Sequence, residues 1–350
     1  MNDAPANLFG LTSDELAALA AQRVARGAGL ARRIHRHAFR TGQLDPAAFG
    51  GGAAAVAAWT AAVRVRLPEV IACQEDADEA DEHHRAGKLI LGLEDGARIE
   101  CVRVPMGRGR VHLCVSCQTG CRQGCAFCQT ASLGAGRNLS SHEITGQVMA
   151  ARLVAGWPVR HVMFMGMGEP CENLDHVIQA MRVLADRYAL GLGQERFTVC
   201  TSGHVDGIRR LAALNWKHLN LAISLNAATD ALRDRLMPIN RRWPLSALQE
   251  ALAAYRPRPA YVLAVNYCLL PGLNDRREDA AAIARFLAPL GKAIVHLIPY
   301  NPGERPLTPA PAAADIERFV GWLRDEGVAV RARVPKGRSI MAACGQLGRK

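Results

Sequence analysis

The sequence predicts an α/β fold, a partial barrel of about six strand–helix units preceded by a small helical domain. From about residue 140 onward, predicted strands alternate with predicted helices, and this alternation favours a parallel sheet. About six units suit a partial barrel better than a complete eightfold one. Four of the predicted strands are followed directly by small polar residues, where barrels of this kind carry their chemistry.

A β-hairpin is expected ahead of the barrel, because two apolar-rich runs are joined by Glu94-Asp95-Gly96-Ala97. The predicted helix Arg276–Leu287 has a clear end, because it stops ahead of Pro289. The predicted strands are Lys88–Leu93, Arg98–Val104, Val159–Gly166, Arg196–Ser202, His218–Ser224, Tyr261–Leu269, Ala293–Ile298 and Val328–Val334. The predicted barrel helices are His142–Ala155, Asn173–Asp186, Leu245–Tyr255, Arg276–Leu287 and Ala312–Glu326.

Four regions are expected along the chain. Residues 1–74 form the small helical domain, in which Thr12-Ser13-Asp14-Glu15 offers capping side chains and Gly50-Gly51-Gly52 separates two helices. Residues 75–87 begin with six acidic side chains within 75–82 and are expected to be an exposed, mobile linker. Residues 88–113 hold the hairpin, and residues 114–350 hold the barrel and a C-terminal tail.

Composition excludes several classes of protein. A hydrophobic content of 49% in 350 residues is enough for a substantial core. No run of eighteen uncharged apolar residues exists, and the first residues lack the order of a secretory signal. Eleven cysteines without an export signal indicate metal-binding or catalytic thiols in a reducing cytoplasm rather than a disulfide scaffold.

The net charge of +11 favours a polyanionic partner, although a general excess of arginine in the proteome would give the same balance. Six arginines lie between Arg23 and Arg40, together with His35 and His37. This segment would either grip RNA with a basic helix face or form an ordinary solvated face, and the sequence leaves both open.

The most distinctive stretch of the chain is Cys121-Arg-Gln-Gly-Cys125-Ala-Phe-Cys128. Three cysteines at this spacing can wrap one tight loop around an inorganic cluster. A [4Fe–4S] cluster is normally held by four thiolates, so three would leave one iron open to a substrate or cofactor.

A zinc site is the competing interpretation of the same cysteines. Cys114-x-x-Cys117 and Cys125-x-x-Cys128 form two pairs of the kind that often hold structural zinc. Such a site leaves Cys121 unexplained. The sequence of this stretch alone leaves the alternative open.

The polar strand ends are candidates for a cofactor pocket. Gly166-Met-Gly-Glu-Pro170 combines glycines, which let a ligand approach the backbone, with the Glu169 carboxylate, which can receive an ammonium group. Each strand end alone is compatible with ordinary turn chemistry. The other three are Cys200-Thr-Ser-Gly203, Ser224-Leu225-Asn226 and Ile298-Pro-Tyr-Asn301-Pro302.

Two further residues are ambiguous when taken alone. Glu100 lies within a predicted strand, where a lone glutamate usually faces solvent. Cys344 lies in the tail Ala342-Ala-Cys-Gly-Gln-Leu347, between small residues near the chain end, where a cysteine can move and react. A lone terminal cysteine is more often incidental than catalytic.

Taken together, these segments resemble the RlmN/Cfr family of radical S-adenosylmethionine (SAM) RNA methyltransferases. The resemblance covers roughly residues 88–350 and is most specific in the pairing of the cluster loop with the Ala-Cys-Gly-Gln-Leu tail. The matching segments are Cys114–Cys121, the cluster loop, Gly136–Leu139, Gly166–Pro170, Ala222–Leu225, Met237–Asn240, Leu297–Pro302 and Ala342–Leu347.

The resemblance implies a [4Fe–4S] cluster and SAM as cofactors, and an adenine carbon (carbon 2 or carbon 8) of rRNA or tRNA as the target. It implies that Cys344 carries the methyl group, that Cys114 resolves the protein–RNA adduct as a disulfide, and that Glu100 accepts a proton. The implied cluster ligands are Cys121, Cys125 and Cys128. The implied SAM contacts are Gly168, Glu169, Cys200, Ser224, Leu225, Asn226 and Asn301.

The resemblance also implies partners for the protein, and the sequence differs from the usual family pattern at several positions. RNA and an electron donor of the flavodoxin or ferredoxin type are implied, no membrane contact is expected, and a monomer is favoured. Cys200 and Asn226 stand where the family usually has serine and histidine, and the run before Cys344 lacks the family's usual acidic residues. Plausible phosphate contacts are Arg108, Arg110, Arg241, Arg242 and Lys336.

Overall fold

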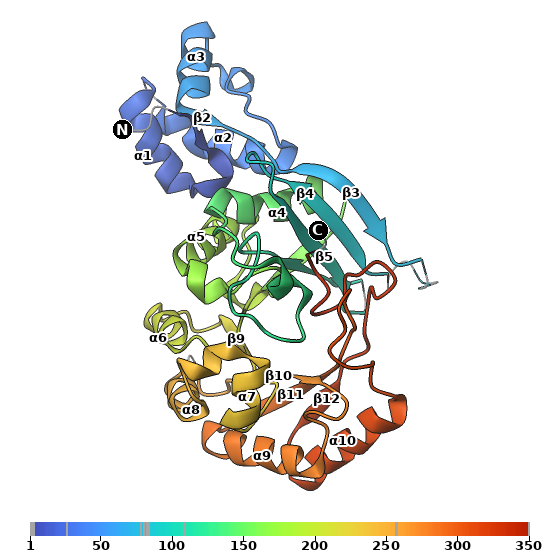
Figure 1. Cartoon of the computed structure of the whole chain (residues 1–350). Coiled ribbons are helices and arrows are strands. Elements are labelled where there is room, and N and C mark those ends of the chain that lie inside the picture. Colours follow the sequence, from blue (N-terminus) through green and yellow to red (C-terminus); the bar gives the residue numbers. More distant parts are fainter. Residues whose placement is uncertain are drawn as a thin grey trace.

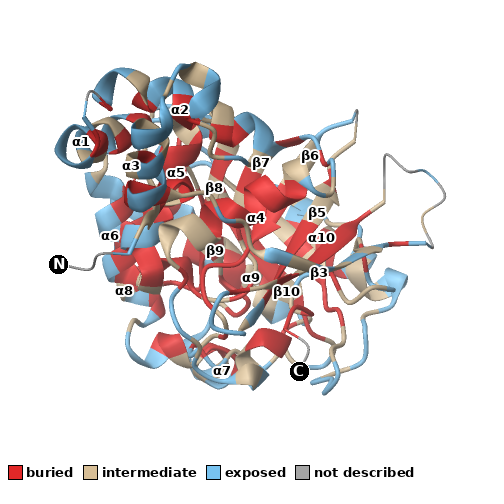
Figure 2. Ribbon diagram, turned by 90° about the horizontal axis from the view of Figure 1, so that it is seen from above, coloured by how far each residue is buried: buried red, intermediate tan, exposed pale blue. Residues whose placement is uncertain are grey.

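The computed structural model describes residues 4–25, 27–77, 79, 81, 85–107, 109–255 and 258–348. A helical N-terminal domain lies at one end of a long curved sheet, whose helices follow one another around its outer side (Figure 1). Most buried residues lie in the strands and on the inner faces of these helices (Figure 2). No helix in the described ranges has the length and apolarity needed to cross a bilayer.

The described part of the N-terminal domain is helical and contains α1 (Ser13–Arg23), α2 (Ala28–Thr41) and α3 (Ala53–Ala62). The Thr12 side chain accepts from the Glu15 backbone, and Glu15 bonds back to Thr12, so the capping box forms. Apolar side chains from all three helices make a separate core that includes Phe9, Ile34 and Trp59. Two short strands close this domain, β1 (Ala6–Asn7) and β2 (Val63–Arg64).

The central sheet has ten strands in the spatial order β12-β11-β10-β9-β8-β7-β6-β5-β4-β3. Strands β6 to β12 are parallel, whereas β3 to β6 are antiparallel to one another. Strand β6 therefore joins a parallel half to an antiparallel half. The strands are β3 (Glu69–Glu75), β4 (Gly87–Gly92), β5 (Arg98–Pro105), β6 (Val111–Val115), β7 (Val159–Phe164), β8 (Phe197–Thr201), β9 (Asn220–Ser224), β10 (Leu263–Leu269), β11 (Ala293–Pro299) and β12 (Val330–Ala332).

Helices connect the parallel strands and cover their outer face, which confirms the predicted partial barrel. They are α4 (Ser141–Leu153), α5 (Leu174–Ala185), α6 (Val205–Ala213), α7 (Asp230–Leu236), α8 (Leu245–Ala254), α9 (Arg277–Leu287) and α10 (Ala313–Asp325). Short 3₁₀ turns lie at Leu8–Gly10, Ala47–Phe49, Gln129–Leu133, Pro170–Asn173, Gln194–Arg196, Pro238–Arg241 and Ala288–Leu290.

The antiparallel half corrects two expectations. Strands β3 and β6 were not predicted, and β3 lies mostly within the expected helical domain 1–74. The expected linker 75–87 connects two paired strands, because Glu75 is opposite Gly87 in the ladder of β3 and β4. It is also not uniformly exposed, since Asp76 is only 8% exposed and holds the C-terminal tail.

Candidate active site

The cluster loop follows β6 and is closed by close backbone contacts. The Cys121 amide donates to the Gly134 carbonyl at 2.9 Å, and the Ala126 amide donates to Leu236 at 2.9 Å. A side chain at Gly120 or Gly136 would collide with the backbone of the other segment, so glycine is required where the two cross. Contacts within the protein thus fix the loop from both sides.

The three predicted cluster cysteines lie close enough for their charges to interact. Burial raises the pKa of the Cys121 thiol to about 12 and raises that of Cys125, and a charge on Cys128 raises both further. A nearby positive charge favours the thiolate forms of Cys121 and Cys125, and bound iron would supply such a charge. Their position on one fixed loop and the chemistry of the three thiols fit a [4Fe–4S] cluster.

The structure gives the paired-cysteine zinc site no support. In the described part of the chain, no three or more His, Cys, Asp or Glu side chains converge on a single-ion site. This finding does not count against an iron–sulfur cluster, whose thiolates each bind a different iron. The extra thiol, Cys117, is buried with its sulfur 3.5 Å from the Met167 carbonyl oxygen.

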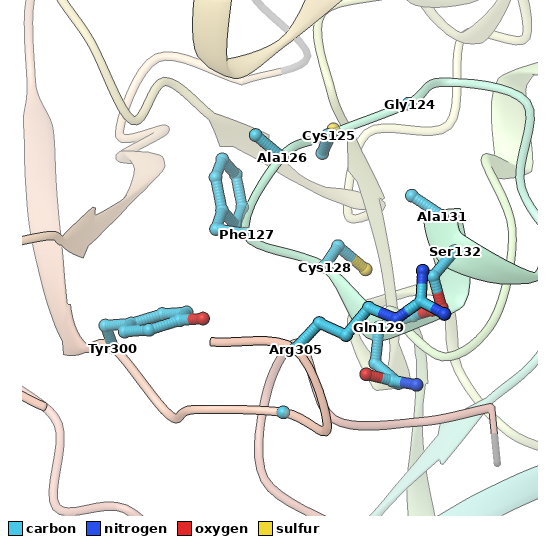
Figure 3. Close-up of a pocket in the computed structure, with 11 residues that line it drawn as sticks. Gly124, Cys125, Ala126, Phe127, Cys128, Gln129, Ala131, Ser132, Tyr300 and Arg305 are labelled. Carbon is cyan, nitrogen blue, oxygen red and sulfur yellow. The ribbon is translucent and has the colours of Figure 1, made fainter. Parts of the chain in front are cut away.

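A cavity of about 280 Å³ lies against the cluster loop (Figure 3). Cys125, Phe127 and Cys128 form one wall, and Tyr300 and Arg305 lie across from them. Tyr300 follows β11, so this wall comes from a strand on the far side of the parallel half. The cavity therefore brings the cluster loop together with one of the predicted polar strand ends.

The strand end after β7 forms as a glycine-rich turn around a buried carboxylate. Gly168 has a φ of +98°, and a Cβ there would lie 2.6 Å from the Gln118 side chain. The Glu169 carboxylate accepts from the Cys171 amide at 3.1 Å and from both the amide and hydroxyl of Ser202 at 2.8 Å. These bonds fix the carboxylate but leave it an acceptor site for an ammonium group.

The ends of β8 and β9 place Cys200 and Ser224 together, with their sulfur and oxygen atoms 3.6 Å apart. Leu225 is fully buried, and the Asn226 side chain is engaged by the protein: its Oδ1 accepts from the Cys268 amide at 2.8 Å. The Asn226 amide nitrogen donates to the Met237 sulfur at 3.3 Å. Of these four predicted SAM contacts, the structure leaves mainly Cys200 and Ser224 with half-buried side chains.

Arg233 is a functional candidate that sequence reasoning missed. Its guanidinium is fully buried and donates to the carbonyls of Ser202, at 2.6 Å, and Leu225, at 3.1 Å. It also donates to the Asn240 side chain at 2.9 Å, and burial lowers its pKa to about 10. Arg233 thus ties the ends of β8 and β9 to the Met237–Asn240 segment.

Glu100, whose place in a strand was ambiguous from the sequence alone, is buried. It is 5% exposed, pairs with the Lys88 ammonium at 3.3 Å and accepts from the Gly348 amide at 3.0 Å. Lys88 also donates to the Met341 carbonyl at 3.3 Å. Antiparallel strands β4 and β5 therefore hold the C-terminal tail through a buried ion pair.

Cys114 and Cys344 lie close enough for their charges to interact. Val102 is opposite Cys114 in the ladder, so alternation places Glu100 and Cys114 on the same face of the sheet. Burial raises the pKa of the Cys114 thiol, and the charge of nearby Cys344 raises it further. Cys344 itself is solvent-accessible, but the surrounding protein atoms raise the pKa of its thiol, and the Arg333 guanidinium opposes that rise.

The tail is fastened on the cluster side as well. The Asn301 side chain donates to the Cys344 carbonyl at 3.3 Å and accepts from Arg338 at 2.6 Å. The Gln129 amide, directly after the last cluster cysteine, donates to the Gly345 carbonyl at 2.7 Å. The structure thus brings Glu100, Cys114, Cys344 and Asn301 to one region beside the cluster loop.

Comparison with known proteins agrees with this architecture. The Radical SAM superfamily matches residues 115–287. The chain is 42% identical to the "Dual-specificity RNA methyltransferase RlmN" of Syntrophotalea carbinolica, over 77% of this chain and 72% of that protein. It is 37% identical to the protein of the same name from Geobacter sulfurreducens, over 99% and 92% of the two chains. A crystal structure of a radical SAM methyltransferase from Sphaerobacter thermophilus superposes with a TM-score of 0.88 at 34% identity, covering 98% and 99% of the chains.

Proposed function

The chain belongs to the RlmN/Cfr family of radical SAM RNA methyltransferases, and on this premise we propose that it methylates carbon 2 or carbon 8 of an adenine in rRNA or tRNA. Cys344 would carry the methyl group. The observation that supports this most directly is the position of Cys344, an accessible thiol on a fastened tail beside Cys114 and the cluster loop.

The cofactor would be held by residues that the fold already orients. A [4Fe–4S] cluster bound by Cys121, Cys125 and Cys128 would supply the electron that cleaves SAM. Glu169, fixed by Ser202 and Cys171, would receive the amino group of SAM. Gly168, Cys200, Ser224 and Asn301 would border the same ligand, and Leu225 and Asn226 would contribute mainly through the backbone.

The chain's own side chains divide the remaining steps. The Cys344 thiolate would attack the methyl group of one SAM, a nucleophilic displacement in which a carbon–sulfur bond to Cys344 forms and S-adenosylhomocysteine leaves with the electrons of the broken bond. After the carbon is joined to the base, the carboxylate of Glu100 takes the proton released from the base carbon. The thiolate of Cys114 would then attack the Cys344 sulfur and form a disulfide as the bond between that sulfur and the transferred carbon breaks. The carbon would keep the bonding electron pair and take up a proton, so that the RNA leaves with a methyl group.

RNA would reach this site along basic surfaces. An adenine must be single-stranded or extruded to be modified. Arg32, Arg33, Arg36 and Arg40 are exposed on α2, and they support the assignment of residues 1–74 as an RNA contact. Arg110, Arg241 and Arg242 are exposed, Lys336 is paired with Glu79 at 3.0 Å, and Arg26 and Arg108 lie outside the described residues.

The reaction needs reducing partners. An electron donor of the flavodoxin or ferredoxin type would reduce the cluster, and a thiol reductant would restore Cys114 and Cys344. Both belong to the cytoplasm, where unpaired cysteines remain reduced. The protein would act there as a monomer.

The test uses anaerobically purified protein reconstituted with iron and sulfide, then incubated with SAM and reductant. Peptide mass spectrometry is expected to find one added methyl mass on Cys344, together with about four irons per chain. A Cys344→Ala variant should lose the modification, whereas Cys117→Ser should keep it. Iron with an unmodified Cys344 would favour a radical SAM enzyme without methyl transfer, and zinc in place of iron would remove the enzyme assignment.

A further inference from the structure

Residues 337–342 form a tight loop just before the tail cysteine. The Ala342 amide donates to the Gly337 carbonyl at 2.8 Å, which closes the loop two residues ahead of Cys344. Gly337 has a φ of +73°, and a Cβ there would lie 3.1 Å from the Cβ of Ala86. The loop is therefore pressed against the connection between β3 and β4, and its shape determines where Cys344 lies.

Asp76, in that connection, binds the loop with both carboxylate oxygens. Oδ2 accepts from the Gly337 amide at 2.9 Å, and Oδ1 accepts from the Ser339 hydroxyl at 2.6 Å. The carboxylate is itself held, because the Asp76 amide donates to the Ala86 carbonyl at 3.0 Å and the residue is buried. Hydrogen bonds to a buried charged acceptor are among the stronger ones in proteins.

The opposite end of the loop is held from the same half of the sheet. The Lys88 ammonium donates to the Met341 carbonyl at 3.3 Å and pairs with Glu100, which in turn accepts from Gly348. Figure 1 shows the C-terminal segment running beside β4 and β5. Asp76 thus holds the start of the loop at Gly337, and Lys88 holds its end at Met341. Cys344 comes shortly after this second end.

We propose that Asp76 is a positioning residue for methyl transfer, fixing residues 337–342 so that Cys344 is presented to the barrel. The proposal rests on the proposed function of Cys344. The Asp76 carboxylate bonds the tail loop and does not line the cavity beside the cluster loop, so it would act through the tail. A small displacement of a reacting group lowers the rate strongly, because the reacting atoms must stay within contact distance.

The first test separates rate from binding. Asp76→Ala is expected to lower kcat for RNA methylation by about 10- to 100-fold, the cost of a displacement of about 1 Å. The KM for RNA should change less than about twofold, since the RNA-facing surface is intact. Asp76→Asn should recover most of kcat, because its amide can accept from Gly337 and donate to Ser339.

A matched control lies in the same connection. Glu79→Gln removes an ion pair to Lys336, the residue next to Gly337, but both partners are partly exposed. It should leave kcat within about twofold of the wild type. An equal loss of kcat in Glu79→Gln and Asp76→Ala would overturn the proposal, because the charge of the segment and not the Asp76 bonds would then matter.

A double-mutant cycle ties the effect to the loop. Ser339→Ala removes one of the two bonds, and adding it to Asp76→Ala should reduce kcat little further, since both changes break the same contact. Fully multiplicative losses would show that Asp76 acts elsewhere, which contradicts the proposal.

Hydrogen exchange gives a readout that does not depend on catalysis. In Asp76→Ala without SAM or RNA, amides in the peptide covering 337–346 should exchange at least about tenfold faster, while those of α5 keep their wild-type rates. Unchanged exchange in the tail overturns the proposal. Wild-type protein that never methylates Cys344 would instead overturn the proposed function, and the exchange result would still decide whether Asp76 holds the tail.

Discussion

The two halves of the sheet contribute to the site in different ways. In the parallel half, β7 to β9 and β11 present Glu169, Cys200, Ser224 and Asn301 at their carboxyl ends. In the antiparallel half, the contributing side chains lie within strands or in a strand connection, as Lys88, Glu100 and Asp76 do. The parallel half offers a pocket for a ligand, whereas the antiparallel half grips another part of the chain.

This difference follows from topology. The carboxyl ends of parallel strands meet at one edge, so turns far apart in sequence converge there. Antiparallel strands have no such shared edge, and their site residues are selected by the face of the sheet that they occupy. A site that spans both halves therefore needs a further segment that contacts each of them. The tail with Cys344 does so, because it is bonded to Glu100 in one half and to Asn301 in the other.

The largest expected effect comes from the cluster loop, at the start of the parallel half. Cys128→Ser removes one of three thiolates, so RNA methylation should fall to background and reconstituted iron well below about four atoms per chain. Iron analysis and the visible absorbance of the cluster check this. Cys117→Ser is the control, because its sulfur bonds the Met167 carbonyl and should leave iron content unchanged. Full iron loading in Cys128→Ser would show that this cysteine is not a ligand.

A large stability effect is expected in the antiparallel half. Lys88→Met leaves the Glu100 carboxylate buried without its cation, a change that typically destabilises by about 3–5 kcal/mol. Denaturant unfolding measures the loss. The double variant Lys88→Met, Glu100→Gln should return most of it, because a neutral amide replaces the unpaired charge. If the single variant is as stable as the wild type, the tail is not held through this pair.

The two halves also differ in how far the sequence predicts them. Cysteine spacing within Cys121–Cys128 and glycines directly after a strand are local signals, so the cluster loop and the Gly168–Glu169 turn were identified from sequence. Asp76 and Gly337 are 261 positions apart, and nothing in either segment indicates the other. The acidic run around Asp76 instead has the composition of a linker, which led to the wrong expectation of exposure.

Strand length explains the remaining misses. β6 is a five-residue strand between a glycine-containing turn and the cysteine-rich loop, and it was placed in the hairpin region. The strand pattern around Glu100 left its environment open, because such a pattern alone does not show that the polar face of the strand is covered. The helices α4, α5, α8, α9 and α10 were found because each extends over at least ten residues, whereas α6 and α7 are shorter.

A smaller effect is expected for the carboxylate that shapes the parallel half. Glu169→Gln replaces one acceptor oxygen by a donor, so one of the hydrogen bonds from Ser202 and Cys171 is lost. This loss should lower the free energy of unfolding by about 1–3 kcal/mol. SAM affinity, measured by equilibrium binding to reconstituted protein, should fall about tenfold with the loss of a charged partner. Asp95→Asn, which alters an exposed ion pair with Arg137, is the control for surface charge. Unchanged SAM binding would remove Glu169 from the pocket.

The smallest expected effect lies where the halves join. His112 of β6 stacks on His161 of β7 at 4.2 Å, and burial together with the nearby His161 and Arg110 charges lowers the pKa of His112 to about 4. Between pH 6.5 and 4, His112 is therefore protonated in the unfolded chain but neutral in the folded protein. The free energy of unfolding is unaffected by His112 above pH 6.5 and decreases as the pH falls below that value. After allowance for the partial exposure of His112, its protonation in the unfolded chain should lower the free energy of unfolding of the wild type by about 1 kcal/mol between about pH 7.5 and pH 5. Urea unfolding of His112→Gln should show a shallower decline over that range, whereas the exposed His176→Gln should follow the wild type. Equal slopes in all three proteins would mean that the junction between the halves admits enough water to keep His112 at its ordinary pKa.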